Sequence, residues 1–369
     1  MEKEILIRRE RGFSLIEALI AMAITLIVMA GALGVIKSMT DMSFAASQTS
    51  ETSQNTQTAL NLMRRDLQKT DNVFVGNNGI PLRNPTTGSN PWNSTRCLDG
   101  SGAPCATGLL PEGTPATPTT RPGLPASTTV VFDAVTPMTV NGRGAISILY
   151  ADSFARRIPV TVQRQTGSTT AAQATINPGA SAEVLERFGA IRRGDIILLE
   201  NPANTDDIVL QVVTSIPSST TIWFGGTAAG TSPPADLTGL NQSFAPSAAI
   251  TYAVTLMRRV TYYVEDRQDE EDATKQVRWL MRQVNTRAAT PLIPGITEFR
   301  LSYDIANTDG VGIAAAAVSS PTAIQRMNIR KVNVTIANTS PGGIPNRPAA
   351  VNTVTTSMAV RRYVSRFDF

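Results

Sequence analysis

The residues that most often carry catalysis are scarce in this sequence, and histidine is absent. Without histidine the chain cannot form a Ser-His-Asp triad, a Cys-His dyad or an HExxH zinc site. It also has no P-loop, GxGxxG, GxSxG or CxxC motif. Serine–lysine chemistry is compatible with the composition, but no motif supports it. We therefore predict that the protein is not an enzyme and has no catalytic residue, cofactor or metal ion.

The only two cysteines are Cys97 and Cys105. Two cysteines are too few for a structural zinc site, and no histidine is available to complete one. Their close spacing is compatible with a local disulfide or with two free thiols. We favour the disulfide, which would stabilise this proline-rich region in an oxidising compartment.

Clustered acidic residues could in principle hold Ca²⁺, which prefers carboxylate oxygens. One cluster lies between two strand-like segments and consists of Glu265, Asp266, Asp269, Glu270, Glu271 and Asp272. We interpret it as a solvated hairpin loop. A second set, Asp304, Asn307 and Asp309, resembles a calcium loop, but Ala306 breaks the required spacing. We predict no metal at either place.

Basic residues could gather into a patch for DNA or another anionic surface. The candidates are Arg258, Arg259, Arg326, Arg330, Lys331, Arg361, Arg362 and Arg366. The chain as a whole has 33 basic and 29 acidic residues, a mild excess that is not typical of a dedicated nucleic-acid-binding domain. We interpret these residues as solvated strand faces, so nucleic acid is a possible partner without specific support.

The N-terminal region is the most informative part of the sequence. No charged residue occurs from Ala18 to Ile36, and a helix of this length is about 28 Å long, close to the hydrocarbon thickness of a bilayer. Basic residues precede this stretch at Lys3, Arg8, Arg9 and Arg11, whereas Lys37 alone follows it closely. The positive-inside rule therefore predicts a single-pass membrane protein with a cytoplasmic N-terminus and everything after Lys37 outside.

The junction RGFSLIEALIAMAI, with Glu17 inside the apolar stretch, resembles the leader of type IV prepilins and pseudopilins. The resemblance implies that a prepilin peptidase cuts after Gly12, methylates the new N-terminus at Phe13 and leaves the apolar helix on the mature protein. It also implies that Glu17 pairs with the N-terminus of a neighbouring subunit during assembly. The alternative is a simple signal anchor in which Glu17 reaches the membrane surface and has no assembly role.

Beyond Lys37 the sequence is free of proline until Pro81. Leu60, Met63 and Leu67 lie at helical spacing at the end of a weakly apolar stripe, so we predict one helix from Phe13 to about Lys69 whose last turns pack against a globular domain. Residues 77–128 are rich in proline and glycine and predict irregular chain. Later segments rich in Val, Ile, Thr and aromatic residues predict antiparallel strands.

We accordingly predict an α+β protein, and the resemblance implies a pilin fold in which the long N-terminal helix packs on an antiparallel β-sheet with a large β-rich head. The expected parts are a cleaved leader (1–12), the helix with its transmembrane segment (13–70), a Pro/Gly-rich loop region with the disulfide (71–128), an elaboration of the head (129–257) and the core sheet (258–369).

The order of the segments YYVED, RWLMRQV and GITEFRLSYDIANTDG resembles the C-terminal half of PilW-type minor pilins. That resemblance implies a minor pilin that is inserted in the inner membrane with a periplasmic head, and is later incorporated at or near the tip of an extracellular type IV pilus to prime assembly. The implied partners are other minor and major pilins, the prepilin peptidase, the inner-membrane assembly platform and, before assembly, the lipid bilayer. Two alternatives are a J-type minor pseudopilin of type II secretion and a DNA-binding or adhesive tip module.

Overall fold

The computed structural model describes residues 14–72, 80–82, 130–132, 134–140, 142–165, 171–177, 179–225, 246, 248–268, 274–285, 288–306, 317–321, 329–339 and 351–360. The chain divides into two compact units. One consists of Met1–Glu51 with Ser340–Ala350, and the other consists of Thr52–Thr339 with Val351–Phe369. We call the second one the head unit.

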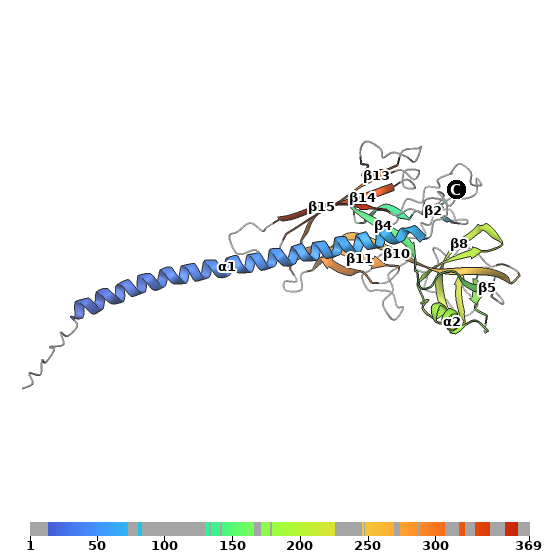
Figure 1. The fold of residues 1–369 in the computed structure, drawn as a ribbon, viewed down its shortest axis with the longest axis horizontal. Helices are drawn as coiled ribbons and strands as arrows, with labels where there is room; N and C mark the ends of the chain where they lie inside the picture. The colour runs from blue at the N-terminus through green and yellow to red at the C-terminus, as the bar shows by residue number, and fades with distance from the viewer. Residues whose placement is uncertain are drawn as a thin grey trace, which may run out of the picture. The chain divides into compact units, whose positions relative to one another are not determined.

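The N-terminal part of the chain forms one long helix, α1 (Leu15–Gln68) (Figure 1). The short 3-10 helix η1 (Lys69–Asn72) follows it. Gly31 and Gly34 lie within α1 without interrupting it. The predicted helix is therefore confirmed, and its end differs by about one residue from the expected one. In the head unit α1 buries Thr52, Thr56, Ala59, Leu60, Met63, Asp66 and Leu67. This agrees with the expectation that only the last turns pack in a core.

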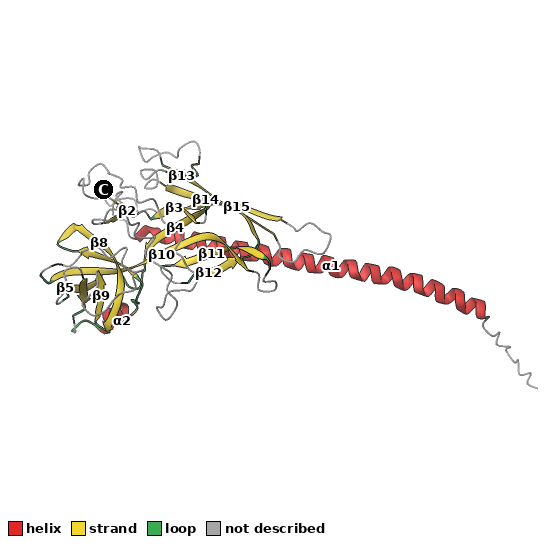
Figure 2. Cartoon of the chain, turned by 180° about the vertical axis from the view of Figure 1, so that it is seen from behind, coloured by secondary structure: helices red, strands yellow, loops and turns green. Residues whose placement is uncertain are grey.

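Figure 2 shows the strands of the head unit in yellow. Within the described residues these strands pair antiparallel and form three sheets. The largest has ten strands: β3 (Val135–Val140), β4 (Arg143–Ala151), β5 (Ile158–Arg164), β6 (Ala171–Thr175), β7 (Ile196–Asn201), β8 (Asn204–Ser218), β9 (Thr221–Gly225), β10 (Ile250–Gln268), β11 (Gln276–Val284) and β12 (Thr290–Ile293). A second has three: β13 (Ile296–Ile305), β14 (Ile329–Thr339) and β15 (Val351–Ala359). The third pairs β1 (Ile80–Leu82) with β2 (Val130–Phe132).

Part of the ten-stranded sheet closes into a barrel. The strands follow the order β10-β5-β6-β9-β8-β7, and β7 pairs again with β10, which closes the ring. The interior is a hydrophobic core that includes Val160, Leu199, Phe224 and Val254. The short helix α2 (Ala182–Gly189) adds Phe188 to this core. The barrel lies in the chain between β4 and the middle of β10.

The second half of β10 belongs to another part of the same sheet, where it pairs with β4 on one side and β11 on the other. There Tyr262 from β10 joins Met63 and Leu67 from α1 in the main hydrophobic core. Val334 and Met358, from β14 and β15, belong to the same core. The end of α1 is thus packed by residues of both larger sheets, which confirms the α+β class and the helix-on-sheet arrangement.

The expected core sheet over residues 258–369 differs from the sheet arrangement in the structure. β10 and β11 pair with β4, whereas β13, β14 and β15 form a sheet of their own. The boundary expected at 257/258 falls inside β10, which is continuous from Ile250 to Gln268. The reason lies in the strand itself: Val254 packs in the barrel and Val260 in the main core, so one strand serves two cores.

Gly295 connects β12 to β13, where the chain leaves the ten-stranded sheet for the three-stranded one. Its φ is +71°, a value that L side chains rarely adopt, and its carbonyl oxygen accepts a 2.8 Å hydrogen bond from the Thr339 amide. A Cβ atom at this position would clash with the Thr339 carbonyl oxygen. The change of sheet therefore depends on a residue without a side chain.

We predict that Gly295→Ala lowers the free energy of unfolding of the head unit by about 2–3 kcal/mol. The cost of a left-handed backbone at alanine adds to the cost of the clash between its Cβ atom and the Thr339 carbonyl oxygen. Gly142→Ala is a matched control, since Gly142 has φ +73° but a Cβ atom added there would have nothing within 4 Å. The control should cost only about 1 kcal/mol. Denaturant unfolding of the full chain in detergent measures both, and equal losses would contradict the prediction.

Candidate functional site

The start of α1 carries a reciprocal cap made by Ser14 and Glu17. The Ser14 amide donates to Oε2 of Glu17 at 3.1 Å, and the Glu17 amide donates to Oγ of Ser14 at 3.4 Å. This is the capping box, in which the N-cap and the third helical residue satisfy each other's backbone amides. The carboxylate of Glu17 is therefore held at the N-terminal end of α1, where the helix dipole favours negative charge.

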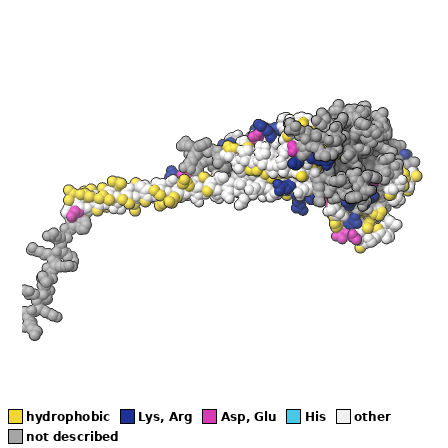
Figure 3. Space-filling view, turned by 45° about the horizontal axis from the view of Figure 1, so that its top comes forward, with side chains coloured by type: hydrophobic (Ala, Val, Ile, Leu, Met, Phe, Trp, Pro, Cys, Tyr) yellow, Lys and Arg dark blue, Asp and Glu magenta, His cyan; other side chains and the backbone are white. Residues whose placement is uncertain are grey.

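The helix that follows Glu17 exposes large apolar side chains around its circumference. Examples are Leu15 at 82% exposed, Met22 at 71% and Ile27 at 73%, and Figure 3 shows hydrophobic side chains covering this length of α1. Thr25, a polar residue in the stretch, donates its hydroxyl to the Ala21 carbonyl at 2.7 Å. Backbone and hydroxyl groups are thus satisfied within the helix, as hydrocarbon surroundings require. Among the described residues α1 is the one helix long and apolar enough to cross a membrane.

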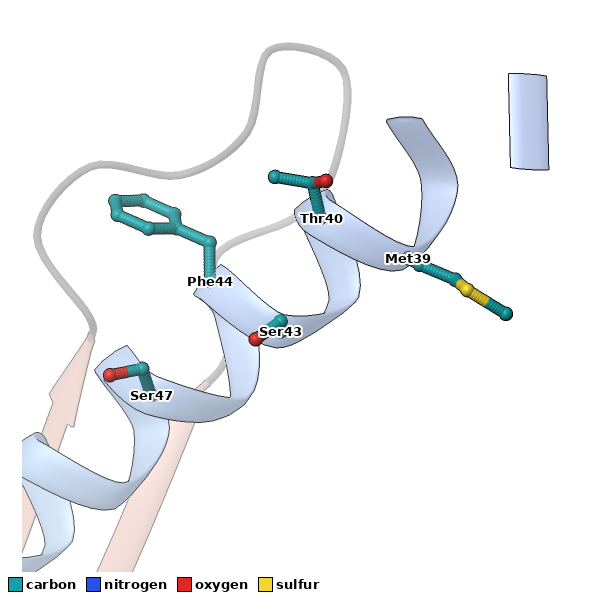
Figure 4. A pocket seen from close by; sticks show the side chains of 5 residues that line it. All are labelled: Met39, Thr40, Ser43, Phe44 and Ser47. Carbon is teal, nitrogen blue, oxygen red and sulfur yellow. The ribbon is translucent and has the colours of Figure 1, made fainter. Parts of the chain in front are cut away.

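A shallow hollow lies further along the same helix, after Lys37. It is lined by Met39, Thr40, Ser43, Phe44 and Ser47, all of them from α1 (Figure 4). None of these side chains titrates near neutral pH or is a common metal ligand. Its described lining is therefore a mixed surface of apolar side chains and hydroxyl groups.

The head unit contains a buried polar cluster around Asp66, a residue of α1 that is only 2% exposed. Its carboxylate accepts hydrogen bonds from the hydroxyl of Tyr150 at 3.2 Å and of Tyr262 at 2.7 Å. It also accepts from Arg282, at 3.1 Å from Nε and 2.9 Å from Nη2. Tyr150, Tyr262 and Arg282 come from β4, β10 and β11, so one carboxylate ties α1 to three adjacent strands.

The pKa shifts in this cluster keep its hydrogen-bond donors protonated. Burial, and then the neighbouring Asp66 charge, raise the pKa of the Tyr150 and Tyr262 hydroxyls, which stay protonated and able to donate. Burial alone would lower the pKa of Arg282, but its neighbours Tyr262 and Asp66 outweigh that effect and raise it. The guanidinium therefore remains the positive partner of Asp66.

Two further contacts support the docking of α1 in the head unit. The ammonium group of Lys69 lies 5.1 Å from the centre of the Tyr150 ring, at cation–π distance. Asn338 of β14 donates its side-chain amide to the hydroxyl of Thr56 at 3.2 Å. The last turns of α1 and the start of η1 are therefore fixed by polar contacts to both larger sheets as well as by apolar packing.

Asp66 was missed by the sequence analysis, although a signal was present. It lies between Met63 and Leu67, on the side of the helix predicted to be buried. A carboxylate on a buried helix face requires a partner of opposite charge or several hydrogen-bond donors. What the local pattern could not identify was the partner, because Arg282 is distant in sequence.

Two of the acidic candidates, Asp266 and Asp304, contact neighbouring side chains in the described part of the chain. Asp266 pairs with Arg143 at 2.7 Å and Arg278 at 3.2 Å, and these guanidinium groups, Arg143 foremost, hold its pKa below the usual range. Asp304 accepts a hydrogen bond from Asn333 at 2.8 Å. Asp269, Glu270, Glu271, Asp272, Asn307 and Asp309 lie outside the described residues. Within the described ranges no cluster of three or more potential metal-ligating residues occurs.

The basic candidates Arg258 and Arg259 are adjacent in β10 but differ in role. Arg258 pairs with Asp152 at 2.9 Å. Arg259 is only 3% exposed and donates to the Ser147 hydroxyl at 2.9 Å, and burial lowers its pKa to about 9. The interpretation of Arg259 as part of a solvated strand face is therefore wrong, because its side chain lies in the interior. Arg326, Arg361, Arg362 and Arg366 lie outside the described residues.

Gly12 and Phe13, the expected cleavage site, also lie outside the described residues, as do Cys97 and Cys105, the expected disulfide. The structure thus brings Glu17 and Ser14 together at the first turn of α1.

A family model described as the prokaryotic N-terminal methylation motif matches residues 7–33. The matched range begins before Gly12, contains Ser14 and Glu17, and ends within the apolar half of α1. No curated protein and no solved structure matches the chain. The match and the exposed apolar helix together characterise a single-pass inner-membrane anchor.

Proposed function

We propose that this type IV prepilin-like protein is a minor pilin, which is processed at the inner membrane and incorporated at or near the tip of a type IV pilus, where it primes assembly. The observation that carries the proposal is the methylation motif over residues 7–33 running directly into an apolar helix capped by Ser14 and Glu17. A helix of this kind serves first as a membrane anchor and then as the part of the subunit that packs in a fibre.

In this proposal the N-terminus lies in the cytoplasm and the head unit lies outside. The basic residues before α1, among them Arg8, Arg9 and Arg11, support this orientation. The partners are the prepilin peptidase and the assembly platform at the membrane, and other minor and major pilins in the fibre. The head unit would contribute no catalysis, and its interior polar cluster around Asp66 would serve to hold the head on the helix.

The processing step gives the direct test. We predict that Gly12→Val abolishes cleavage, because a branched side chain at the last leader residue obstructs the peptidase, whereas glycine has none. The wild-type chain should be recovered from membranes without its first twelve residues and with a methylated Phe13. Intact-mass measurement of the purified chain checks both changes.

Gly31→Val is the matched control, since it makes the same substitution within α1 at a glycine where an added Cβ atom has nothing within 4 Å. It should be cleaved normally. Equal cleavage of Gly12→Val and wild type would contradict the proposed processing at Gly12. The wild-type chain could also be cleaved normally, be absent from sheared pili and be required for protein secretion. These results together would indicate a secretion pseudopilus instead.

A further inference from the structure

The last strand of the head unit, β15, has one free edge among the described residues. The three-stranded sheet has the order β13-β14-β15, so β14 covers one side of β15 and no other described strand pairs with it. β15 pairs with β14 in a continuous register from Lys331 opposite Ala359 to Thr339 opposite Val351, without a bulge. Figure 1 shows β15 beside β14 in this sheet. The strand is therefore regular over its full length.

The hydrogen bond from the Val360 amide to the Arg330 carbonyl, 2.8 Å long, identifies which backbone groups face outward. In an antiparallel pair, alternate residues direct both their N–H and C=O groups at the partner strand. Even-numbered residues of β15 therefore bond to β14. The N–H and C=O groups of the odd-numbered residues point away from β14: Val351, Thr353, Thr355, Ser357 and Ala359.

The odd-numbered side chains of β15 are also exposed, and two of them anchor the strand to β14. The hydroxyls of Thr355 and Thr335 lie 3.1 Å apart, and Ser357 donates to Asn333. The even-numbered Met358 is buried in the main core. Side-chain contacts to β14 and the burial of Met358 thus fix the position of β15 in the sheet. Its outward backbone groups remain available for pairing with another strand.

Natural proteins usually protect a long edge strand with charged residues, proline, a bulge or a short length. β15 has nine residues, VNTVTTSMA, which include no charge and no proline. The side chains of β15 are uncharged, so pairing this strand with another uncharged strand removes no charged group from water. The chemistry of the edge therefore matches an extended, uncharged polypeptide segment.

We propose that the free edge of β15 accepts an extended, uncharged strand from a neighbouring subunit in the fibre, in the manner of β-strand addition. The inference rests on the proposed function, which brings such subunits next to one another. Main-chain hydrogen bonds from the outward groups of Thr353, Thr355 and Ser357 supply the contact. The small outward side chains let the incoming strand approach closely.

Thr355→Pro tests the edge selectively. Proline removes the outward N–H at the centre of the edge and places its ring there, but the hydrogen bonds to β14 come from the even-numbered residues and are kept. We predict a normally inserted and cleaved chain whose amount in sheared fibres falls at least tenfold. Thr355→Ala keeps the amide and is the matched control, with incorporation close to that of wild type.

Thr355→Lys provides a second variant, because it retains the amide and adds an edge charge that opposes strand pairing. Hydrogen exchange gives an independent readout: the outward amides of β15 should exchange faster in the detergent-solubilised chain than in fibres. Wild-type incorporation of both the Pro and Lys variants, or equal exchange in the two states, would overturn the inference. Gly12→Val tests the proposed function separately, so the edge can fail while the pilin assignment stands.

Discussion

Replacing Asp66 with alanine should lower the free energy of unfolding of the head unit by about 3–4 kcal/mol. Removing the carboxylate leaves the hydroxyls of Tyr150 and Tyr262 without their acceptor and the guanidinium of Arg282 without its charge partner. The Arg282 side chain is 23% exposed, so solvent offsets part of the loss and the upper end of the range for fully buried pairs is not expected. Denaturant unfolding of the full chain in detergent, followed by tryptophan fluorescence, measures the change.

Arg64→Ala is the matched control, because Arg64 is an exposed residue two positions before Asp66 on the same helix. Its loss should change the free energy of unfolding by no more than about 0.5 kcal/mol. Asp66→Asn separates charge from hydrogen bonding, since the amide oxygen still accepts from a tyrosine hydroxyl but no longer balances Arg282. An Asp66→Ala variant as stable as Arg64→Ala would show that the cluster does not hold α1 in the head unit.

Local sequence patterns were sufficient to predict α1. A long stretch without proline, with apolar residues at helical spacing near its end, determines the helix and the face that is buried. Leu60 and Met63 are buried as the spacing indicates, and α1 ends at Gln68, close to the expected Lys69. The capping box at Ser14 and Glu17 was not predicted, although both partners lie within one turn.

The arrangement of strands could not be predicted in the same way. Antiparallel pairing joins residues far apart in sequence, and β10 is the clearest example: Val254 pairs with Leu199 and Ile158, whereas Tyr262 pairs with Ile146 and Arg282. A strand-like composition indicates that a segment is extended but not which neighbours it has. The barrel inserted between β4 and β10, and the separate sheet of β13–β15, were therefore missed.

The candidate site was predicted only where its chemistry is local. The motif around Gly12, Phe13 and Glu17 is contiguous and distinctive, and the matched family model covers the same residues. The cluster around Asp66 depends on tyrosine and arginine side chains from three strands, so its partners required the fold. Arg259 illustrates the same limit, since nothing beside it in sequence indicated that it would be buried.

The second large effect is expected at Glu17, whose role differs between an assembly subunit and a simple anchor. We predict that Glu17→Gln inserts and is cleaved normally but enters fibres poorly, with at least a tenfold loss in sheared pili. A carboxylate and an amine about 4 Å apart attract each other by about 4 kcal/mol at an effective dielectric constant near 20, and glutamine abolishes this attraction. Insertion should persist, because an uncharged side chain resides in lipid at lower cost.

The capping box makes this substitution unusually selective. Glutamine at the third helical position can still accept the Ser14 amide, so Glu17→Gln removes the charge and retains the cap. Ser14→Ala is the complementary variant, since it removes the hydroxyl that accepts the Glu17 amide and keeps the charge. If charge pairing drives assembly, Ser14→Ala should assemble far better than Glu17→Gln. Wild-type incorporation of Glu17→Gln would remove the assembly role, and equal defects in the two variants would assign it to the cap rather than to the charge.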